Sequence, residues 1–230
     1  METKGKILVV VFVVLALCAA NTCAKLVQIG LTADVTSVTD FGGLLGGRIN
    51  VGDTITGHYT FDSDTPDTDW NGGSASDMVG RYWHRTPPYG ISLNAGGFVF
   101  QTDPDNVNFL IEIVNDYRDN YGLISDRNAP LYDNVIVNCI WVQLDDYPGT
   151  ALLSDALPAT PPVLEDWLDN PFELMITGVT WPPRAPDARG FMIYGNVRSV
   201  WLVPEPATIL LLGLGGLALL RKCRKPDAGH

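Results

Sequence analysis

The chain has 230 residues, with 26 Asp and Glu against 15 Lys and Arg and a formal net charge of −11 at pH 7. An acidic balance of this size excludes a general nucleic-acid-binding surface, because the surface and the phosphates would repel each other. The four cysteines include no pair at the spacing of a zinc site, so we expect the fold to be stabilised by a packed core.

The N-terminus has the layout of a secretory signal peptide. Lys4 and Lys6 precede an unbroken apolar run over residues 7–17, and small residues follow it up to Ala24. We therefore expect residues 1–24 to direct export, with cleavage after Ala24 preferred to cleavage after Ala20. A lipoprotein signal is disfavoured, because no small residue stands directly before either nearby cysteine.

Removing the two terminal segments sharpens the acidic balance of the part between them. That part has 24 acidic and nine basic side chains, a balance compatible with cations, neutral glycans or solubility alone. Its thiol content depends on signal cleavage. A cut after Ala24 leaves Cys139 as the single thiol, whereas a cut after Ala20 would permit a Cys23–Cys139 disulfide.

Alternating apolar and polar residues predict antiparallel strands along the middle of the chain. We expect strands at residues 26–38, 54–61, 91–93, 98–100, 109–113, 135–144, 172–176 and 191–203. Residues 94–97 predict a hairpin loop, and residues 164–168 a single helical turn. The segment 135–144 is apolar on both faces, which predicts a central strand. The sequence thus predicts one all-β domain over residues 25–202, an antiparallel β-sandwich of jelly-roll type.

The densest acidic cluster follows the predicted strand at 54–61. It contains Asp62, Asp64, Asp67 and Asp69, and alternating carboxylates in a loop can bind Ca²⁺. The cluster lacks the glycine and the closing glutamate of a helix–loop–helix calcium motif. A solvated turn is therefore the alternative to a calcium site.

Six tryptophans raise the alternative of a carbohydrate-binding module. We place Trp70, Trp83 and Trp181 in loops, where exposed rings could stack on sugars, and Trp141 and Trp201 in the core. Packing of the loop tryptophans against the domain is the competing interpretation.

Signals of catalysis are few, and the sequence predicts a domain that is not an enzyme. His58 and His84 have no partner at metal-ligand spacing, and there is no Gly-x-Ser-x-Gly nucleophile motif. A secreted hydrolase remains the second alternative. It would require two carboxylates close together in a cleft, one of them with a raised pKa.

The C-terminal part combines three features in a fixed order. Pro204-Glu205-Pro206 precedes an apolar run over residues 207–220, and four cations follow at Arg221, Lys222, Arg224 and Lys225. The two prolines favour an extended, accessible segment. The apolar run of 14 residues spans about 21 Å as a helix, against about 30 Å for a bilayer core. A marginal anchor suits a segment that is to be removed.

Cations precede the N-terminal apolar segment and follow the C-terminal one. The positive-inside rule assigns both cationic ends to the cytoplasm, so we expect the acidic domain between them outside. Two alternatives to a removable anchor stay open, a core helix over residues 207–220 and a tail anchor that is never cleaved.

Residues 203–225, which precede a tail at 226–230, resemble a PEP-CTERM sorting signal. The resemblance implies that an exosortase-type membrane protease recognises Pro204, Glu205 and Pro206 and cuts nearby. It also implies a Gram-negative host and a setting alongside exopolysaccharide. Residues 38–40, 51–53, 59–62 and 154–158 resemble exported domains that precede such signals, which implies a fold without an activity. We expect an exported cell-envelope or extracellular-matrix protein.

Overall fold

The computed structural model describes residues 26–68, 78–132, 134–167, 173–180 and 189–204. The expected signal peptide and the segment 205–230 lie outside these residues. The described part forms ten strands, β1 (Leu26–Phe41), β2 (Thr54–Asp62), β3 (Val79–His84), β4 (Gly90–Ala95), β5 (Phe98–Gln101), β6 (Phe109–Val114), β7 (Asp119–Ser125), β8 (Val135–Asp146), β9 (Glu173–Thr180) and β10 (Gly190–Leu202). One short 3-10 turn, η1, spans Leu164–Asp166.

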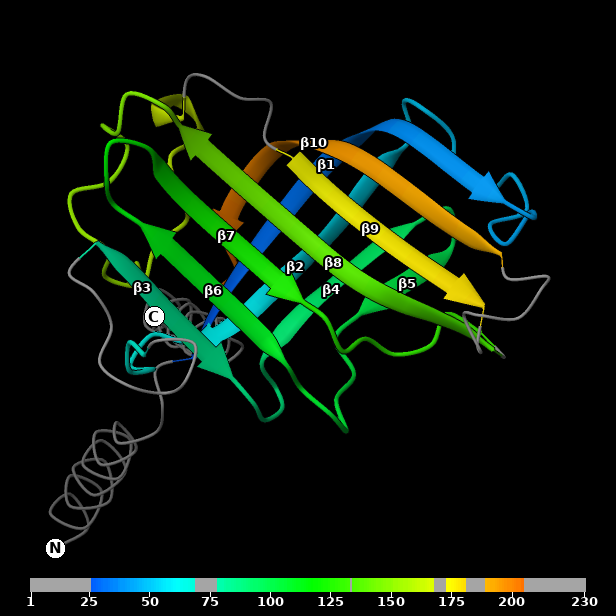
Figure 1. The fold of residues 1–230 in the computed structure, drawn as a ribbon, viewed down its shortest axis with the longest axis horizontal. Helices are drawn as coiled ribbons and strands as arrows, with labels where there is room; N and C mark the ends of the chain where they lie inside the picture. Colours follow the sequence, from blue (N-terminus) through cyan, green and yellow to red (C-terminus); the bar gives the residue numbers. More distant parts are fainter. Residues whose placement is uncertain (1–25, 69–77, 133, 168–172, 181–188, 205–230) are drawn as a thin grey trace, which may run out of the picture.

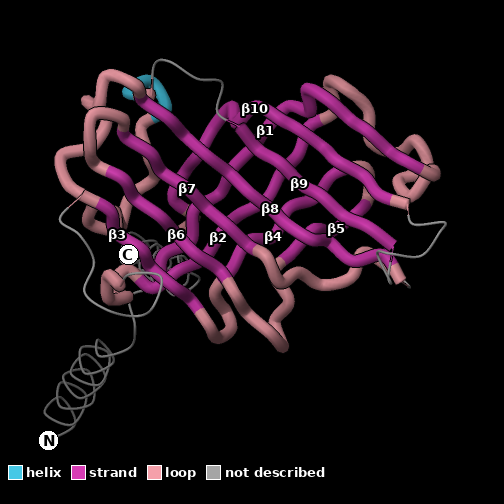
Figure 2. The backbone as a smooth tube through the Cα atoms, in the orientation of Figure 1, coloured by secondary structure: helices cyan, strands magenta, loops and turns pink. Residues whose placement is uncertain are grey.

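All ten strands belong to one antiparallel sheet with the order β3-β6-β7-β8-β9-β10-β1-β2-β4-β5. The sheet curls over, so that β3 and β6 to β9 form a front layer that crosses the strands behind it (Figure 1). The strands β10, β1, β2, β4 and β5 form the back layer. Figure 2 shows loops in the described connections between strands, together with the short helical turn η1 between β8 and β9.

The expected all-β, antiparallel class is confirmed, and the two facing layers resemble those of a sandwich. The expected jelly-roll connectivity is not observed. The layers are halves of one continuous sheet, and β6 to β10 follow one another in sequence and in space. Among the described strands, β3 alone pairs with neither of the strands that precede and follow it along the chain, since it follows β2 but pairs with β6.

The first and last strands lie side by side in the sheet. β1 pairs with β10 from Ile29↔Leu202 to Phe41↔Gly190. The last backbone hydrogen bond of this pair runs from the Val203 amide to the Gln28 carbonyl, at 2.8 Å. The chain therefore enters and leaves the sheet at the same end of neighbouring strands.

A bulge explains why the segment 135–144 looks apolar on both faces. The register of β8 against β9 shifts between Val137 and Cys139, so Asn138 has no partner and the side-chain alternation changes phase. The buried residues of β8 on both sides of the bulge then share the inner face: Val135, Val137, Ile140, Val142 and Leu144.

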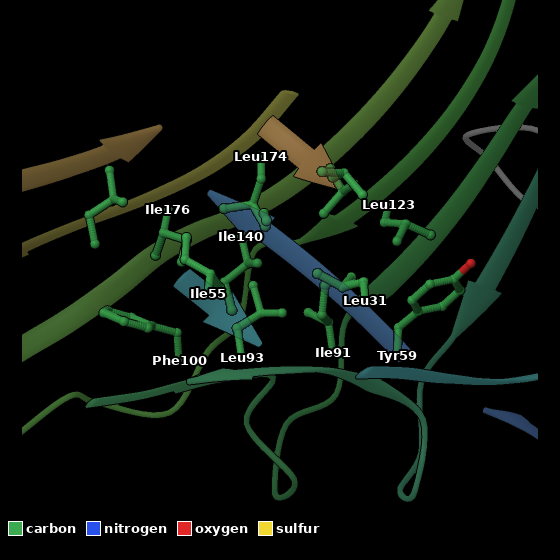
Figure 3. Packing of buried hydrophobic residues seen from close by; sticks show 14 of the residues in the cluster. Leu31, Ile55, Tyr59, Ile91, Leu93, Phe100, Leu123, Ile140, Leu174 and Ile176 are labelled. Atoms are coloured by element: carbon green, nitrogen blue, oxygen red, sulfur yellow. The ribbon is translucent and has the colours of Figure 1, made fainter. Parts of the chain in front are cut away.

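The core lies between the two layers (Figure 3). Leu31, Ile55 and Leu93 of the back layer are buried together with Leu174 and Ile140 of the front layer. Each such side chain contributes about 1.5–3 kcal/mol when it is fully buried. The facing inner surfaces of a single curled sheet thus form the packed core that we expected to stabilise a chain with few cysteines.

A buried polar contact crosses this core. The hydroxyl oxygens of Tyr59 in β2 and Tyr121 in β7 lie 2.9 Å apart, and both rings are buried. Burial raises the pKa of both phenols well above the ordinary value. The two neutral hydroxyls satisfy each other, so the hydrogen bond joins the back layer to the front layer.

We predict that Tyr121→Phe lowers the free energy of unfolding by about 1–3 kcal/mol, because it leaves the Tyr59 hydroxyl buried without its partner. Urea unfolding measures the change. The double variant Tyr59→Phe/Tyr121→Phe is the control. It removes both hydroxyls, so it should lose less stability than the sum of the two single variants. Additive losses would contradict a pairwise bond across the core.

Candidate functional site

The outer face of the front layer presents an unusual apolar row. Alternation along each strand turns these side chains away from the core, and direct cross-strand pairing aligns them over four strands. We call this set the apolar row: Trp83, Leu110, Ile124 and Trp141. Leu110 is fully buried, yet it is not part of the inner core. Leu110 itself is therefore not accessible on the outer surface.

A second, polar row runs parallel to the apolar row. Arg81 pairs across the strands with Glu112, Glu112 with Gly122, and Gly122 with Gln143. The Arg81 guanidinium donates to the Glu112 carboxylate at 2.6 Å. Gly122 stands in the middle of this row, beside Ile124 of the apolar row, so the polar row lacks a side chain at that position.

A groove of about 360 Å³ lies over this gap. Its lining includes Trp141 from the apolar row together with Glu112, Gly122 and Gln143 from the polar row. A Cβ added to Gly122 would meet its nearest atom, Asn120 Oδ1, at 3.3 Å and no other atom closer than 3.7 Å. No close backbone contact therefore requires glycine at this position. The missing side chain leaves open space above the strand.

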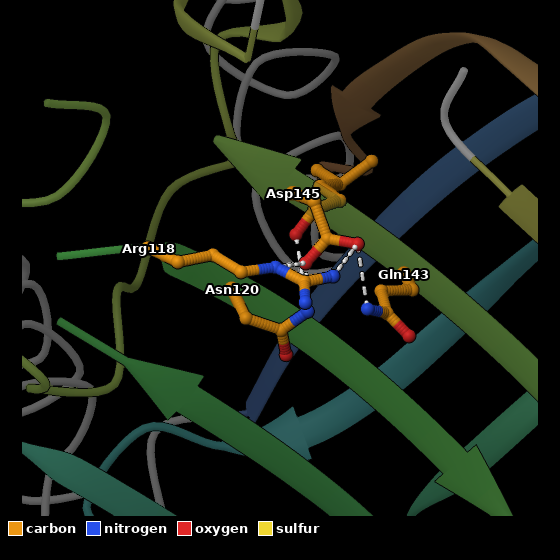
Figure 4. Close-up of polar contacts among 5 residues, drawn as sticks. Arg118, Asn120, Gln143 and Asp145 are labelled. Carbon is orange, nitrogen blue, oxygen red and sulfur yellow. Dashed lines mark hydrogen bonds and ion pairs between the residues drawn. The ribbon is translucent and has the colours of Figure 1, made fainter. Parts of the chain in front are cut away.

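A buried carboxylate organises one wall of the groove (Figure 4). Asp145 is 4% exposed. Its Oδ1 accepts from Asn120 Nδ2 at 2.8 Å and from Arg118 Nε at 3.2 Å. Its Oδ2 accepts from Gln143 Nε2 at 2.7 Å and lies 2.7 Å from Arg118 Nη2. The two amides and the guanidinium are thus held by one anion.

The network keeps Asp145 ionised. Burial alone would raise the pKa of this carboxyl, but the hydrogen bonds from Arg118, Asn120 and Gln143 hold the pKa below its ordinary value. The hydrogen bond to Asp145 in turn raises the pKa of Arg118. Asp145 therefore acts as a fixed anchor for neighbouring side chains and is unsuited to donating a proton.

Two tyrosines lie beside this network. Tyr117 lines the groove and is 83% exposed. The Arg118 Cζ lies 4.6 Å from the ring centroid of Tyr147. The groove thus has aromatic groups on two sides, Trp141 within the sheet and Tyr117 near its end.

The structure corrects the expected positions of the described tryptophans. Trp83, which we expected in a loop, lies in β3, and the Arg85 guanidinium lies 4.0 Å from the centroid of its ring. Trp141 and Trp201 lie in strands as expected, but neither is in the core. Trp141 lines the groove, and Trp201 is 43% exposed. Trp70 and Trp181 fall outside the described residues.

The acidic cluster after β2 binds backbone amides. Asp62 Oδ1 accepts from the Asp64 amide at 3.0 Å, and Asp67 Oδ1 accepts from the Arg81 amide at 2.7 Å. Within the described ranges, no three His, Cys, Asp or Glu side chains gather closely enough to bind a metal ion. Asp69 lies outside those ranges, and the calcium site stays a prediction.

The thiol of Cys139 is half-buried and free, and burial raises its pKa. Cys23, its expected alternative partner, lies outside the described residues.

Of the expected recognition residues Pro204, Glu205 and Pro206, the structure describes only Pro204, which is exposed directly after Val203, whose amide makes the last ladder hydrogen bond of β10. Glu205, Pro206 and the cations at Arg221, Lys222, Arg224 and Lys225 lie outside the described residues. The part of the chain that the structure does describe contains no helix with the length and hydrophobicity of a membrane span.

Comparison with known proteins identifies the C-terminal segment. A family model described as the PEP-CTERM protein-sorting motif matches residues 202–225. No curated protein and no solved structure matches the chain. Residues 202–225 therefore form a PEP-CTERM protein-sorting motif, a membrane-anchored export signal that implies processing by an exosortase.

Proposed function

We propose that the chain is a non-catalytic protein of the cell surface or extracellular matrix, delivered by its signal peptide and released by an exosortase near Pro204-Glu205-Pro206. The main support for this proposal is the position at which the folded sheet ends and the sorting motif continues. The sheet ends at Leu202, and the last ladder hydrogen bond belongs to Val203. A cut at or after Pro204 therefore removes no hydrogen bond from the sheet and leaves the described domain whole.

The destination of the released domain follows from the resemblance of its tail. Such signals imply a Gram-negative envelope in which exopolysaccharide is produced, so exopolysaccharide is the expected surrounding material. The acidic composition suits a domain that stays soluble there.

The groove on the front layer favours carbohydrate binding as a second candidate function, through Trp141 and the side chains around it.

The state of His84 supports the non-catalytic part of the proposal. The ring is 2% exposed. Its Nε2 lies 3.1 Å from the Asp62 amide, which donates to it, and 3.0 Å from Thr65 Oγ1. Burial lowers the pKa of His84. A neutral, enclosed imidazole of this kind stabilises the turn after β2 and does not exchange protons with a substrate.

The proposed sorting is tested by mass spectrometry of the protein from its native host. We expect mature ends near residue 25 and near residues 204–206. Replacing Pro204, Glu205 and Pro206 by alanine should cause the uncut precursor to accumulate in the membrane fraction. Recovery of a soluble wild-type protein that extends to His230 would refute the proposal.

We further predict that a chain ending at Pro204 has a free energy of unfolding within about 0.5 kcal/mol of the full chain in the same buffer, because the sheet is complete. A chain ending at Arg198 is the matched control. It loses the four pairs of β10 with β1 from Ile29↔Leu202 to Thr32↔Ser199. Its stability should fall by about 2 kcal/mol or more. Equal stability of the two truncated chains would show that the end of β10 is dispensable.

A pH series tests the buried state of His84. The folded pKa lies below the ordinary 6.5, so below about pH 6.5 the unfolded chain binds a proton that the folded chain excludes. Stability should therefore fall between pH 7 and pH 5, and His84→Asn should reduce that fall. The pKa of His58 is also lowered by burial. The fall in stability of His84→Asn is therefore compared with that of His58→Asn. Identical pH profiles for wild type and His84→Asn would contradict an enclosed neutral imidazole.

A further inference from the structure

We propose that the groove on the outer face of the front layer binds a neutral glycan chain. Its lining joins Ile124 and Trp141 of the apolar row to the polar side chains beside them. The groove volume of about 360 Å³ lies in the range of pockets that bind small ligands.

The polar groups beside the apolar row match sugar hydroxyls. A hydroxyl is both a donor and an acceptor, and so is the carboxamide of Asn120 and of Gln143. Asp145 accepts from the Nδ2 of Asn120 and the Nε2 of Gln143, which fixes the orientation of both amides before a ligand arrives. Rigid polar groups beside an aromatic face are the usual composition of a site that binds small polar molecules.

Gly122 provides the space for the ligand. It stands between Glu112 and Gln143 in the polar row, and its strand neighbour Ile124 stands in the apolar row. Its backbone φ is not positive, so no conformational need for glycine exists at this position. The structural effect of glycine here is the open floor on which a sugar ring can rest against Trp141.

The charges of the site favour a neutral ligand. The Arg118 guanidinium is paired with Asp145, and the Arg81 guanidinium with Glu112. Asp116 adds a further carboxylate to the groove lining. Each cation at the groove already faces a carboxylate within the protein, and the whole chain is strongly acidic. A uronate, sulfate or phosphate group would therefore meet net repulsion.

This inference depends on the proposed function only for the source of the glycan, since an exported domain meets envelope polysaccharide. Binding itself is a property of the folded sheet. A failure of glycan binding and a failure of exosortase processing are therefore separate results, measured on different samples.

The test is affinity electrophoresis of the full chain, solubilised in a detergent without a sugar headgroup. The gels contain a neutral polysaccharide (dextran, mannan or galactomannan) or the anionic polysaccharide alginate. We expect retardation by at least one neutral polymer and none by alginate. Retardation by alginate, with or without a neutral polymer, or by none of the four would overturn the proposal.

Variants place the binding on the groove. Trp141→Ala removes the stacking ring and Gly122→Leu fills the floor, and each should weaken binding at least tenfold. Trp201→Ala removes an exposed tryptophan of β10 outside the groove lining and should bind as wild type does. Thermal unfolding shows whether each variant is folded. Unchanged binding by a folded Gly122→Leu protein, or an equal loss in Trp201→Ala, would place the binding elsewhere and refute this site.

Discussion

The pairing of β1 with β10 is the constraint on which the rest of the structure depends. These strands are neighbours in the middle of the sheet order, with the whole front layer on one side and the remaining back layer on the other. Their paired residues are separated by most of the chain, from Ile29 with Leu202 to Phe41 with Gly190. Separating the two strands would divide the sheet into two parts, each with an exposed apolar face. The core therefore exists only because the two ends of the domain meet.

The inner and outer faces of the front layer present different side chains, because successive side chains along a strand point to opposite faces of the sheet. On the inner face, Tyr121 and Leu123 of β7 enter the core. On the outer face, Asn120, Gly122 and Ile124 of the same strand line the groove. Cross-strand register then aligns each outer residue with those of β6 and β8, so the rows of the groove follow directly from the pairing that builds the core.

Most strands could be predicted from alternation, whereas the sheet order and the site could not. β7 was missed because Asp119, Asn120 and Gly122 are typical of a loop, yet in the structure they are a buried acid, a groove amide and the groove floor. Trp141 was assigned to the core because the bulge at Asn138 is invisible in the sequence, and it reverses which residues of β8 face outward. Trp83 was assigned to a loop because Gly80 and Arg81 interrupt the apolar pattern of β3. Register and bulges depend on partners far away in the chain, so local patterns do not determine them.

The position of the sorting motif relates export to folding. If export proceeds from the N-terminus as proposed, β1 would leave the membrane first and its partner β10 last, so one edge of β1 would stay unpaired until the chain is exported up to Val203. Pairing across so long a separation is slow, because the closure of a large loop precedes any gain from contacts. The apolar run that begins at Ala207 follows within four residues. Under the proposed function, an anchor in that place would hold the chain at the membrane until β10 pairs with β1. A cut beyond Val203 would then release a domain whose first and last strands are already paired.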